Sequence, residues 1–540
     1  MDGGDAEEGK GAQEERKKGG RPDEPMGSRN VASMYSSIQE INRNSMKNVP
    51  MQVPSQMYID GKWVAAENSE TMAVLNPASQ EVLATVPKGT REDARRAIDA
   101  AVEARVRAES MTAYERSKVL LKVAQLLEQN AQEMATLITK NVGKPITDSE
   151  AETARGVVTL TFAAEEAKRI YGQTYPLDAY QFPPGNQNRL GFTIREPIGV
   201  VGAISPFNFP LNLLLHKVAP ALAAGNTVVV KPPSDGPLPA LMLAKLCEEA
   251  GLPRGILNVV LGPGGEVGDE LITSAKIDAI SFTGDTETGR TIAEKGARTN
   301  KKMILELGGH NPLIVLDDAK VVNAVSSALM GTFSYAGQVC TATRRIILSE
   351  RIKERFLTQF EQAVGTLKVG DPMDRTTSVG PVINVRSLQK IDDLVKDASG
   401  KGAKVMLGGS RMSYGELAQG NYYAPTILDG VVGGMNIAQT EVFGPVSAIM
   451  EASNDDEAVE MANNTIYGLQ ASIYTSDLAR GIRLAKRIKA GGVMINDRTN
   501  LRWDNAPFGG IKRSGMGREG VSLAIGELTE VKFIVANIAE

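Results

Sequence analysis

Residues 200–231 have the sequence VVGAISPFNFPLNLLLHKVAPALAAGNTVVVK, and the order of patterns within them decides the fold class. A short apolar run, Val200–Ile204, is followed by a helical segment near Leu211–Ala224 and then by a β-branched run, Thr227–Lys231. Short apolar strands separated by helices of this length are typical of a parallel sheet that is covered by helices. The segment therefore predicts an α/β fold.

The same alternation continues toward the C-terminus in two blocks. In the first block the pattern predicts strands and helices at Leu238–Ala250, Leu257–Leu261, Val267–Ser274, Ile277–Thr283, Thr286–Gly296 and Met303–Glu306. A second block, which begins near Pro312, contains Leu313–Leu316, Val321–Thr332, Arg345–Leu348, Ile352–Leu367, Lys404–Leu407, Val446–Met450 and Gly492–Asn496. Ligands of such sheets bind beyond the carboxyl ends of the strands, so we expect a binding cleft there.

The segments before residue 200 predict a helical body and a projecting arm. Gln56–Val64 is expected to form an extended pair around the Asp60-Gly61 turn. Apolar residues at helical spacing predict helices at Arg91–Ala108, Tyr114–Asn141 and Thr147–Tyr171. Breaks within Tyr175–Arg195 predict a β-hairpin arm, and the run Glu530–Val535 predicts an edge strand. Both are natural partners for another subunit.

Composition excludes several functional classes. At 540 residues the chain is too long for one core, so we expect two or more domains. A net charge of −4 and a pI near 5.7 give no general attraction to nucleic acid or to anionic membranes. Two cysteines cannot form a disulfide framework, which favours a reducing, cytoplasmic compartment. With only two histidines beside them, a metal site of the common type is not expected.

Two segments suggest other interpretations that their residues do not support. The apolar run Val200–Val230 carries one ionised side chain, Lys217, but prolines interrupt it, which argues against a membrane span. Residues 1–50 are rich in glycine and in charges of both signs, so we expect a disordered tail. This tail has neither the apolar segment of a signal peptide nor the acid-poor composition of a mitochondrial transit peptide. Its basic clusters are interleaved with acids, so no nucleic-acid partner is expected.

The segment Phe333–Arg345 holds the best candidate for a nucleophile. Cys340, within it, follows small and polar residues that leave its sulfur approachable. A lone cysteine is more often a buried structural residue, and Cys247 fits that role because it lies in a predicted helix. A thiolate at Cys340 would be a nucleophile for a carbonyl carbon.

Two other side chains complete a candidate catalytic set. Glu306 ends an apolar strand and precedes Gly308-Gly309; it is either the partner of a salt bridge or a base that activates water. Asn208 lies between two phenylalanines in Ser205–Pro210, and its amide could form an oxyanion hole together with the Cys340 N–H. A thiol, a carboxylate and an amide are the groups needed to attack a carbonyl, activate a water and stabilise an oxyanion.

Two glycine-rich loops are candidates for binding the phosphates of a cofactor. Gly262–Gly268 and Phe282–Gly289 each follow a predicted strand and open a helix, which favours a dinucleotide. Neither contains the G-x-G-x-x-G fingerprint, so each alone also fits an ordinary turn. Lys231 ends another strand and places a cation where a ribose or its phosphate would lie.

Together these residues resemble the aldehyde dehydrogenase superfamily, over the chain from about Met57 to the C-terminus. The resemblance rests on motifs in the family's order: Ser205–Pro210, Val230–Ser234, Phe282–Gly284, Leu305–Gly309, Gly337–Cys340, Glu441–Pro445 and Pro507–Lys512. They are most similar to the branch of non-phosphorylating glyceraldehyde-3-phosphate, lactaldehyde and semialdehyde dehydrogenases. The resemblance implies an α/β aldehyde dehydrogenase fold with a Rossmann-like cofactor domain, an α/β catalytic domain and a β-hairpin oligomerisation arm.

The resemblance also implies boundaries, a cofactor and an assembly. Residues 55–178 and 198–308 would form the cofactor-binding domain, and residues 309–507 the catalytic domain. Residues 179–197 and 520–540 would form the oligomerisation arm and its edge strand. The cofactor would be NADP or NAD, the substrate a small aldehyde, and the assembly a homodimer or homotetramer.

Roles of single residues follow from the same resemblance. Cys340 would be the nucleophile, Glu306 the base for deacylation and Asn208 the oxyanion donor. The cofactor would contact Ser205, Pro206, Phe207, Lys231, Ser234, Gly264, Gly268, Phe282, Thr283, Gly284, Asp285, Leu307, Glu441 and Phe443. Members that prefer NAD often have a Glu in place of Ser234, so NADP is acceptable here. The family usually has Ser in place of Asp285, whose charge is unfavourable beside a pyrophosphate unless it turns away.

The expected reaction is NAD(P)-dependent oxidation of a small hydroxyaldehyde or anionic semialdehyde to its acid, through a cysteine thiohemiacetal and thioester. Glu306 favours hydrolysis over transfer to coenzyme A. Succinate-semialdehyde dehydrogenase and non-phosphorylating glyceraldehyde-3-phosphate dehydrogenase are the specific alternatives, although Val339 is not the arginine expected in the second. A catalytically idle scaffold subunit is a remote alternative, because all three catalytic groups are present.

Residues near the substrate are expected to be Arg155, Phe209, His216, Val339, Thr341, Arg498 and Arg502. The three arginines would present a cationic mouth to an anionic substrate. The alternative interpretation pairs these arginines with Asp497, Asp504 or Glu152.

Overall fold

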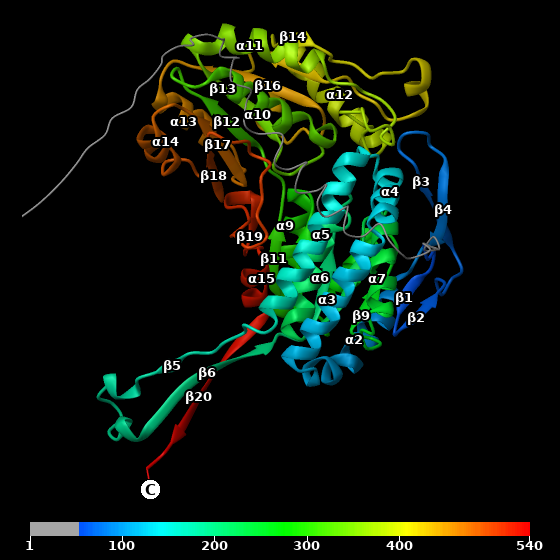
Figure 1. Ribbon diagram of the computed structural model, residues 1–540, viewed down its shortest axis with the longest axis vertical. Helices are drawn as coiled ribbons and strands as arrows, with labels where there is room; N and C mark the ends of the chain where they lie inside the picture. Colours follow the sequence, from blue (N-terminus) through cyan, green and yellow to red (C-terminus); the bar gives the residue numbers. More distant parts are fainter. Residues whose placement is uncertain (1–52, 540) are drawn as a thin grey trace, which may run out of the picture. The chain divides into compact units, whose positions relative to one another are not determined.

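Strands from distant parts of the chain assemble into two large sheets in the computed structural model, which describes residues 53–539 (Figure 1). The tail expected at residues 1–50 lies outside the described residues. The first sheet has the strand order β19-β11-β10-β7-β8-β9-β1-β2. Its strands are β1 (Met57–Ile59), β2 (Lys62–Val64), β7 (Val200–Ile204), β8 (Thr227–Lys231), β9 (Leu257–Val259), β10 (Ala279–Thr283), β11 (Lys302–Glu306) and β19 (Gly515–Met516). The strands from β11 to β9 run parallel, and antiparallel β19 and β1 flank them, which confirms the α/β class.

Helices surround this sheet because its central strands are apolar throughout. These helices are α2 (Arg91–Ser110), α3 (Ala113–Gln129), α4 (Ala131–Val142), α5 (Ile146–Glu166), α6 (Asn212–Ala224), α7 (Leu238–Glu249), α8 (Asp269–Thr273), α9 (Thr286–Gly296) and α15 (Val521–Glu527). Strands β7 and β8 are buried along their whole length, as is typical of parallel strands with both faces covered. Helix α6 is buried at every residue, which explains why Val200–Val230 carries so few charges. Within residues 53–539, no helix is long and apolar enough to span a bilayer.

The second sheet has the order β14-β15-β16-β13-β12-β17-β18. Its strands are β12 (Asn311–Val315), β13 (Thr343–Ser349), β14 (Lys404–Leu407), β15 (Thr426–Asp429), β16 (Val446–Ala452), β17 (Gln470–Tyr474) and β18 (Gly492–Ile495). The helices packed with it are α10 (Val321–Phe333), α11 (Glu350–Gly365), α12 (Val385–Gly400), α13 (Asp455–Asn463) and α14 (Leu478–Ala485). Successive residues of a strand point to opposite faces, so Ile346 and Ile347 of β13 belong to two different apolar clusters.

A three-stranded sheet forms the arm that extends from these elements in Figure 1. Strand β20 (Thr529–Asn537) pairs antiparallel along its whole length with β6 (Arg189–Pro197). The other edge of β6 meets β5 (Thr174–Tyr175), as expected for a hairpin arm. The C-terminal segment is a strand only over Thr529–Asn537, because Val521–Glu527 forms α15 and buries Val521, Ala524 and Ile525 at helical spacing.

Three features of the structure differ from the expected pattern. The single helix expected at Tyr114–Asn141 is two helices, α3 and α4, which meet at Asn130. The Asn130 Nδ2 donates to the Leu126 carbonyl at 2.8 Å and so ends α3. The chain also returns to the first sheet late, because β19 pairs with β11 and sets Gly515 opposite Glu306. A separate ribbon of β3 (Thr71–Leu75) and β4 (Val82–Pro87) was not expected.

Candidate active site

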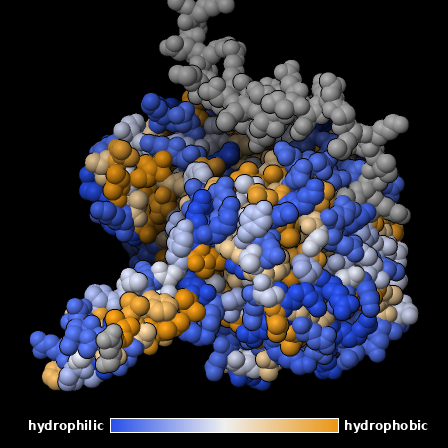
Figure 2. Space-filling view, turned by 60° about the horizontal axis from the view of Figure 1, so that its bottom comes forward, coloured by the Kyte–Doolittle hydropathy of each residue, from blue (hydrophilic) through white to orange (hydrophobic). Residues whose placement is uncertain are grey.

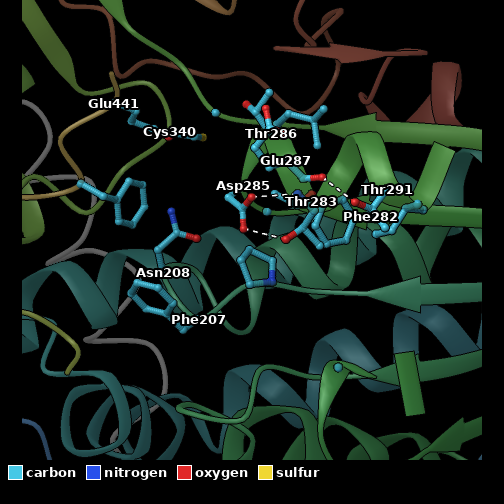
Figure 3. Close-up of a pocket in the computed structure, with 18 of the residues that line it drawn as sticks. Phe207, Asn208, Phe282, Thr283, Asp285, Thr286, Glu287, Thr291, Cys340 and Glu441 are labelled. Atoms are coloured by element: carbon cyan, nitrogen blue, oxygen red, sulfur yellow. Dashed lines mark hydrogen bonds between the residues drawn. The ribbon is translucent and has the colours of Figure 1, made fainter. Parts of the chain in front are cut away.

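A cleft of about 1490 Å³ lies at the carboxyl ends of the parallel strands of the first sheet (Figure 3). It is lined by almost all of the residues predicted to contact a cofactor: Ser205, Pro206, Phe207, Lys231, Gly264, Gly268, Phe282, Thr283, Gly284, Asp285, Leu307, Glu441 and Phe443. Ser234 is the exception, because it is exposed outside the lining and its Oγ donates to the Gly262 carbonyl at 3.5 Å. The predicted nucleophile Cys340 and the predicted oxyanion donor Asn208 both line the same cleft.

Asn208 is positioned by the loop that follows β7. Its side chain is 3% exposed, and its Oδ1 accepts the Phe209 N–H at 3.1 Å. This hydrogen bond uses the oxygen of the amide and leaves the Nδ2 donors available to a ligand. Phe207 precedes Asn208 in the chain, and its ring packs edge to face against the Phe443 ring, with 5.8 Å between the ring centroids.

Cys340 is held by a loop with an unusual backbone. Tyr335 and Ala336, just before it, have φ angles of 48° and 51°, in the left-handed region that favours glycine. Buried Arg344 fixes the loop by donating to the carbonyls of Gly337, Val339 and Gly444. Burial raises the pKa of the Cys340 thiol well above its usual value, and the nearby Glu306 and Glu441 raise it further. The thiol is therefore protonated in the protein without ligand.

Glu306 ends β11 with a buried carboxyl group that is 2% exposed. In the described part of the chain, neither of its oxygens has a hydrogen-bond partner, so the salt bridge considered for this residue is not formed. Burial, with a further contribution from Glu519, raises the pKa of Glu306 to about 8. Arg502 and Lys217 oppose that shift without overcoming it.

The other wall of the cleft has the donors and open space that a dinucleotide needs. The Lys231 ammonium is buried and donates to the Pro232 carbonyl at 2.9 Å, and burial lowers its pKa to about 8. The Ser205 Oγ is buried there without a hydrogen-bond partner among residues 53–539. Gly264 and Gly265 face open space, since an added Cβ would contact nothing within 4 Å. These residues fit a cofactor with a ribose and phosphates.

The side chain of Asp285 is directed toward the N-terminus of α9, the helix that it precedes. Its carboxylate caps α9 by accepting from the Thr288 N–H at 2.8 Å and from the Thr288 hydroxyl at 2.7 Å (Figure 3). The N-terminus of α9 therefore already has a bound carboxylate, although the residue still lines the cleft.

The residues expected near a substrate do not belong to the lining of this cleft, and their contacts show what each one does in the structure. Arg155 donates from Nε to Asp504 at 3.1 Å, which is one of the alternative pairings considered for it. His216 lies 3.4 Å from the same carboxylate, and burial lowers its pKa well below the usual value, so the imidazole is neutral. Arg502 pairs with Glu519 at 3.0 Å, which was not foreseen, and packs over the Phe508 ring at 4.1 Å.

The remaining residues of that set have structural neighbours. Phe209 faces the ammonium of Lys144, 3.6 Å from its ring centroid. Val339 and Thr341, which flank Cys340, are buried, and the Thr341 carbonyl accepts the Thr499 hydroxyl at 2.7 Å. The guanidinium of Arg498 forms no ion pair with Asp497, whose carboxylate accepts the Arg498 backbone N–H at 2.8 Å. Within residues 53–539, the Nε of Arg498 is buried without a hydrogen-bond partner.

Sequence reasoning missed two groups of residues at this site. Helix α12 contributes Arg386 and Lys390 to the cleft, but its amphipathic sequence resembles any surface helix. Buried Lys217 donates to Thr283 at 2.7 Å and pairs with Glu519 at 3.0 Å, next to Glu306. The sequence indicated a special role for Lys217 only through its position, as the one ionised side chain of a long apolar run. Among the described residues, no cluster of three or more His, Cys, Asp or Glu side chains is placed to hold a metal ion.

A parallel sheet with a dinucleotide-sized cleft beside a thiol, an amide and a buried carboxyl fits the class of NAD(P)-dependent oxidoreductases. The family model described as the aldehyde dehydrogenase family matches residues 63–534, and the chain belongs to that family. It is an NAD(P)-dependent aldehyde dehydrogenase, as the resemblance implied.

Individual relatives are similar over almost their whole length. The chain is 40% identical to 3-sulfolactaldehyde dehydrogenase of Priestia aryabhattai over 482 residues, which is 89% of this chain and 98% of that one. It is also 40% identical to lactaldehyde dehydrogenase of Methanocaldococcus jannaschii over 484 residues, 89% of this chain and 99% of that one. The crystal structure of betaine aldehyde dehydrogenase from Staphylococcus aureus in complex with NAD+ matches with a TM-score of 0.87 at 36% identity, covering 90% and 96% of the two chains.

Proposed function

We propose that this enzyme oxidises a small aldehyde to its carboxylic acid with Cys340 as nucleophile, Asn208 as oxyanion donor and Glu306 as base. The observation that carries the proposal is the state of Glu306. Its carboxyl is buried, lacks a hydrogen-bond partner among the described residues, and acts electrostatically on the Cys340 thiol. A carboxyl group with a pKa of about 8 is a stronger base than an exposed glutamate and suits the activation of water.

The first step forms a bond between Cys340 Sγ and the carbonyl carbon of the aldehyde, after the thiol has lost its proton. The carbonyl oxygen becomes an oxyanion, which the Asn208 Nδ2 and the Cys340 N–H stabilise by donating hydrogen bonds. A bound NAD(P)+ would supply the acceptor for the hydride lost from that carbon, so that the bond to Cys340 becomes a thioester. The residues proposed to hold it are Lys231 and Glu441 at its riboses and Phe443 beside its nicotinamide.

The second step releases the acid. Glu306 takes a proton from a water molecule, whose oxygen bonds to the acyl carbon while the C–S bond breaks. The products are the carboxylic acid and the Cys340 thiolate, so one aldehyde and one water have become one acid with the loss of two electrons. The presence of this base supports hydrolysis rather than transfer to coenzyme A.

Charge near Cys340 supports an aldehyde with an anionic tail. Two buried cations, Lys217 and Arg502, share one carboxylate, Glu519. Glu306 is mostly protonated near neutral pH, because its pKa is raised to about 8, so one positive charge is not balanced. Arg155 does not add to it, since Asp504 pairs with it. Within residues 53–539, the Nε and Nη1 of Arg502 are buried without hydrogen-bond partners, and we propose that they receive the tail of the substrate.

The names of the relatives include both a sulfonated and a neutral hydroxyaldehyde. The charge of the substrate therefore distinguishes the candidate aldehydes. Initial rates with NAD and with NADP should be compared on sulfolactaldehyde, succinic semialdehyde, glyceraldehyde 3-phosphate and lactaldehyde, with Cys340→Ala as the blank. We expect kcat/KM for an anionic aldehyde to exceed that for lactaldehyde, and Arg502→Met to remove the difference. A clear preference for lactaldehyde would contradict the role of Arg502, and turnover by Cys340→Ala would contradict the mechanism.

We also propose the predicted division into residues 55–178 and 198–308 for the cofactor and 309–507 for catalysis, which the two sheets support. The free thiols of Cys247 and Cys340 support a reducing, cytoplasmic location. The arm supports a homodimer or homotetramer, because its strand β20 exposes Val531, Phe533 and Val535 on one face (Figure 2).

A further inference from the structure

The proposed reaction requires two separate loops to keep a fixed relative position. Asn208 lies between β7 and α6, whereas Cys340 lies between α10 and β13. An oxyanion donor is effective only within hydrogen-bond distance of the developing charge. A displacement of about 1 Å in an active site can cost about 10²-fold in rate. A group that contacts both loops would therefore fix this relative position.

Glu152, in helix α5, fixes the end of the Asn208 loop. Its Oε1 accepts the backbone N–H groups of Leu211 at 3.0 Å and of Asn212 at 3.1 Å. These are the orphan donors of the first turn of α6, which begins at Asn212. A buried carboxylate from another helix thus caps α6 three residues after Asn208.

Lys144 reaches both loops at once. Its ammonium pairs with the Oε2 of Glu152, and both side chains are fully buried. The same ammonium lies 3.6 Å from the ring centroid of Phe209, the residue after Asn208. It also lies 4.8 Å from the ring centroid of Tyr335, in the strained turn that leads to Cys340. Cation–π contacts of a desolvated ammonium are among the stronger contacts of their kind.

The Tyr335 side of this arrangement is fixed as well. Its hydroxyl donates to the Val142 carbonyl at 2.7 Å, at the end of α4 and two residues before Lys144. Burial lowers the pKa of Lys144, and Glu152 opposes that shift. A charged pair in such a place is costly unless it makes several contacts, and here it makes contacts to both loops.

We propose that the Lys144–Glu152 pair is a positioning device that sets the Asn208 amide against Cys340, an inference that rests on the proposed function. Glu152 holds the backbone of one loop, and Lys144 joins the aromatic ring of that loop to the aromatic ring of the other. Neither residue touches the substrate. Their effect passes through the position of the oxyanion donor.

The test compares Lys144→Met with Lys301→Met, which removes another buried ammonium whose contacts are to Ser274 and Ile277. We expect Lys144→Met to lower kcat about 10- to 100-fold with an unchanged KM for NAD(P). Alkylation of Cys340 by iodoacetamide, which does not use Asn208, should change much less than kcat. Lys144→Arg should restore part of kcat, and Lys301→Met should leave kcat and KM near wild type. Equal losses in both Met variants would contradict the proposal.

A double-mutant cycle separates positioning from general stability. In the Asn208→Ala background, Lys144→Met should cause no further loss of kcat, because the group it positions is gone. Full additivity of the two losses would overturn the proposal. If Lys144→Met alone fails to fold, Lys144→Met/Glu152→Gln leaves no unpaired buried carboxylate and takes its place in the cycle.

Hydrogen exchange gives a readout that does not depend on turnover. Lys144→Met should reduce amide protection in both Phe209–Asn212 and Tyr335–Cys340, and Lys301→Met in neither. If the wild-type enzyme forms no NAD(P)H from any aldehyde while both loops lose protection, the proposed function fails and the positioning device stands. If turnover is present but protection of the two loops is unchanged, the device fails and the function stands.

Discussion

Glu306 shows how its surroundings determine what a single residue can do. The same carboxyl group on the surface would be ionised at neutral pH and would be a weak base. At the end of β11 it is buried beside Glu519, and its pKa rises to about 8. The residue is therefore held near the point at which it can take a proton from water and later release it.

Turnover should follow the ionisation of Glu306. Only the ionised carboxylate can accept a proton from water, so kcat should rise as the pH increases through about 8. Glu306→Gln should lower kcat by about 10²–10⁴-fold and remove this dependence. The measurement is kcat between pH 6 and pH 10 for both proteins. A variant that kept the wild-type pH profile would assign the base to another residue.

Thermal stability gives an independent control on the same ionisation. The pKa of Glu306 is about 8 in the folded protein and near its ordinary value of 4.5 when unfolded, so the folded state binds more protons between these values. The stability associated with this group is fully present below about pH 4.5 and is lost as the pH rises through 8. The difference between the Tm of Glu306→Gln and the Tm of wild type should therefore become more positive as the pH rises from 5 to 9.

Helices α9 and α12 differ in the charge that they present to the cleft. The N-terminus of a helix is a natural site for a phosphate, but α9 satisfies its own donors with Asp285. Across the cleft, α12 presents Arg386 and Lys390 one turn apart. Arg386 and Lys390 therefore add positive charge to the cleft, whereas the N-terminus of α9 is occupied by its own cap.

Asp285→Asn should strengthen cofactor binding. Asparagine caps a helix about as well as aspartate, so the change removes the charge and keeps the cap. An exposed pair of charges interacts with about 0.2–1 kcal/mol, so removal of the repulsion should lower the Kd for NAD(P) by about 1.5- to 5-fold. Equilibrium titration followed by protein fluorescence measures this Kd. An unchanged Tm is the control for the cap, and weaker binding would show that the carboxylate assists the cofactor.

The order of elements and most of the residues that line the cleft could be predicted because both depend on short stretches of sequence. The strand patterns, the Asn208 loop and the Cys340 segment each fit within about ten residues. The sequence offered Asp504 only as one of three candidate partners for the arginines and could not select it, because it lies 349 residues from Arg155 and is brought there by the fold. Asn130 likewise ends α3 through a side-chain hydrogen bond that apolar periodicity does not reveal.

At the scale of the whole molecule, the arm has a surface rich in exposed apolar side chains. Its exposed residues include Tyr175, Tyr180, Phe182, Leu190, Val531, Phe533, Val535 and Ile538 (Figure 2). Alternate residues of β20 share one face, and Phe533 meets Tyr175 edge to face at 5.7 Å. Such a surface needs a partner, and a second copy of the chain is the one proposed here.

Phe533→Glu should weaken the assembly. A charge on the apolar face of β20 would be buried without a partner in the proposed interface. Light scattering after gel filtration should give a multiple of 57.7 kDa for wild type and a lower mass for the variant. Lys532→Gln, on the opposite face of the same strand, is the matched control and should keep the wild-type mass. A monomeric wild-type protein would contradict the proposed assembly.

The late return of the chain to the first sheet limits how the enzyme can be divided for engineering. Strand β19 covers the outer side of β11 next to Glu306, yet it is contributed from residues 515–516. A fragment cut after residue 308 would contain every glycine loop of the cleft but would leave that backbone edge bare. Exposed edges of this kind recruit strands from other molecules. A transplantable cofactor module must therefore be built by splicing the segment around β19 onto β11 through a designed linker, rather than by truncation.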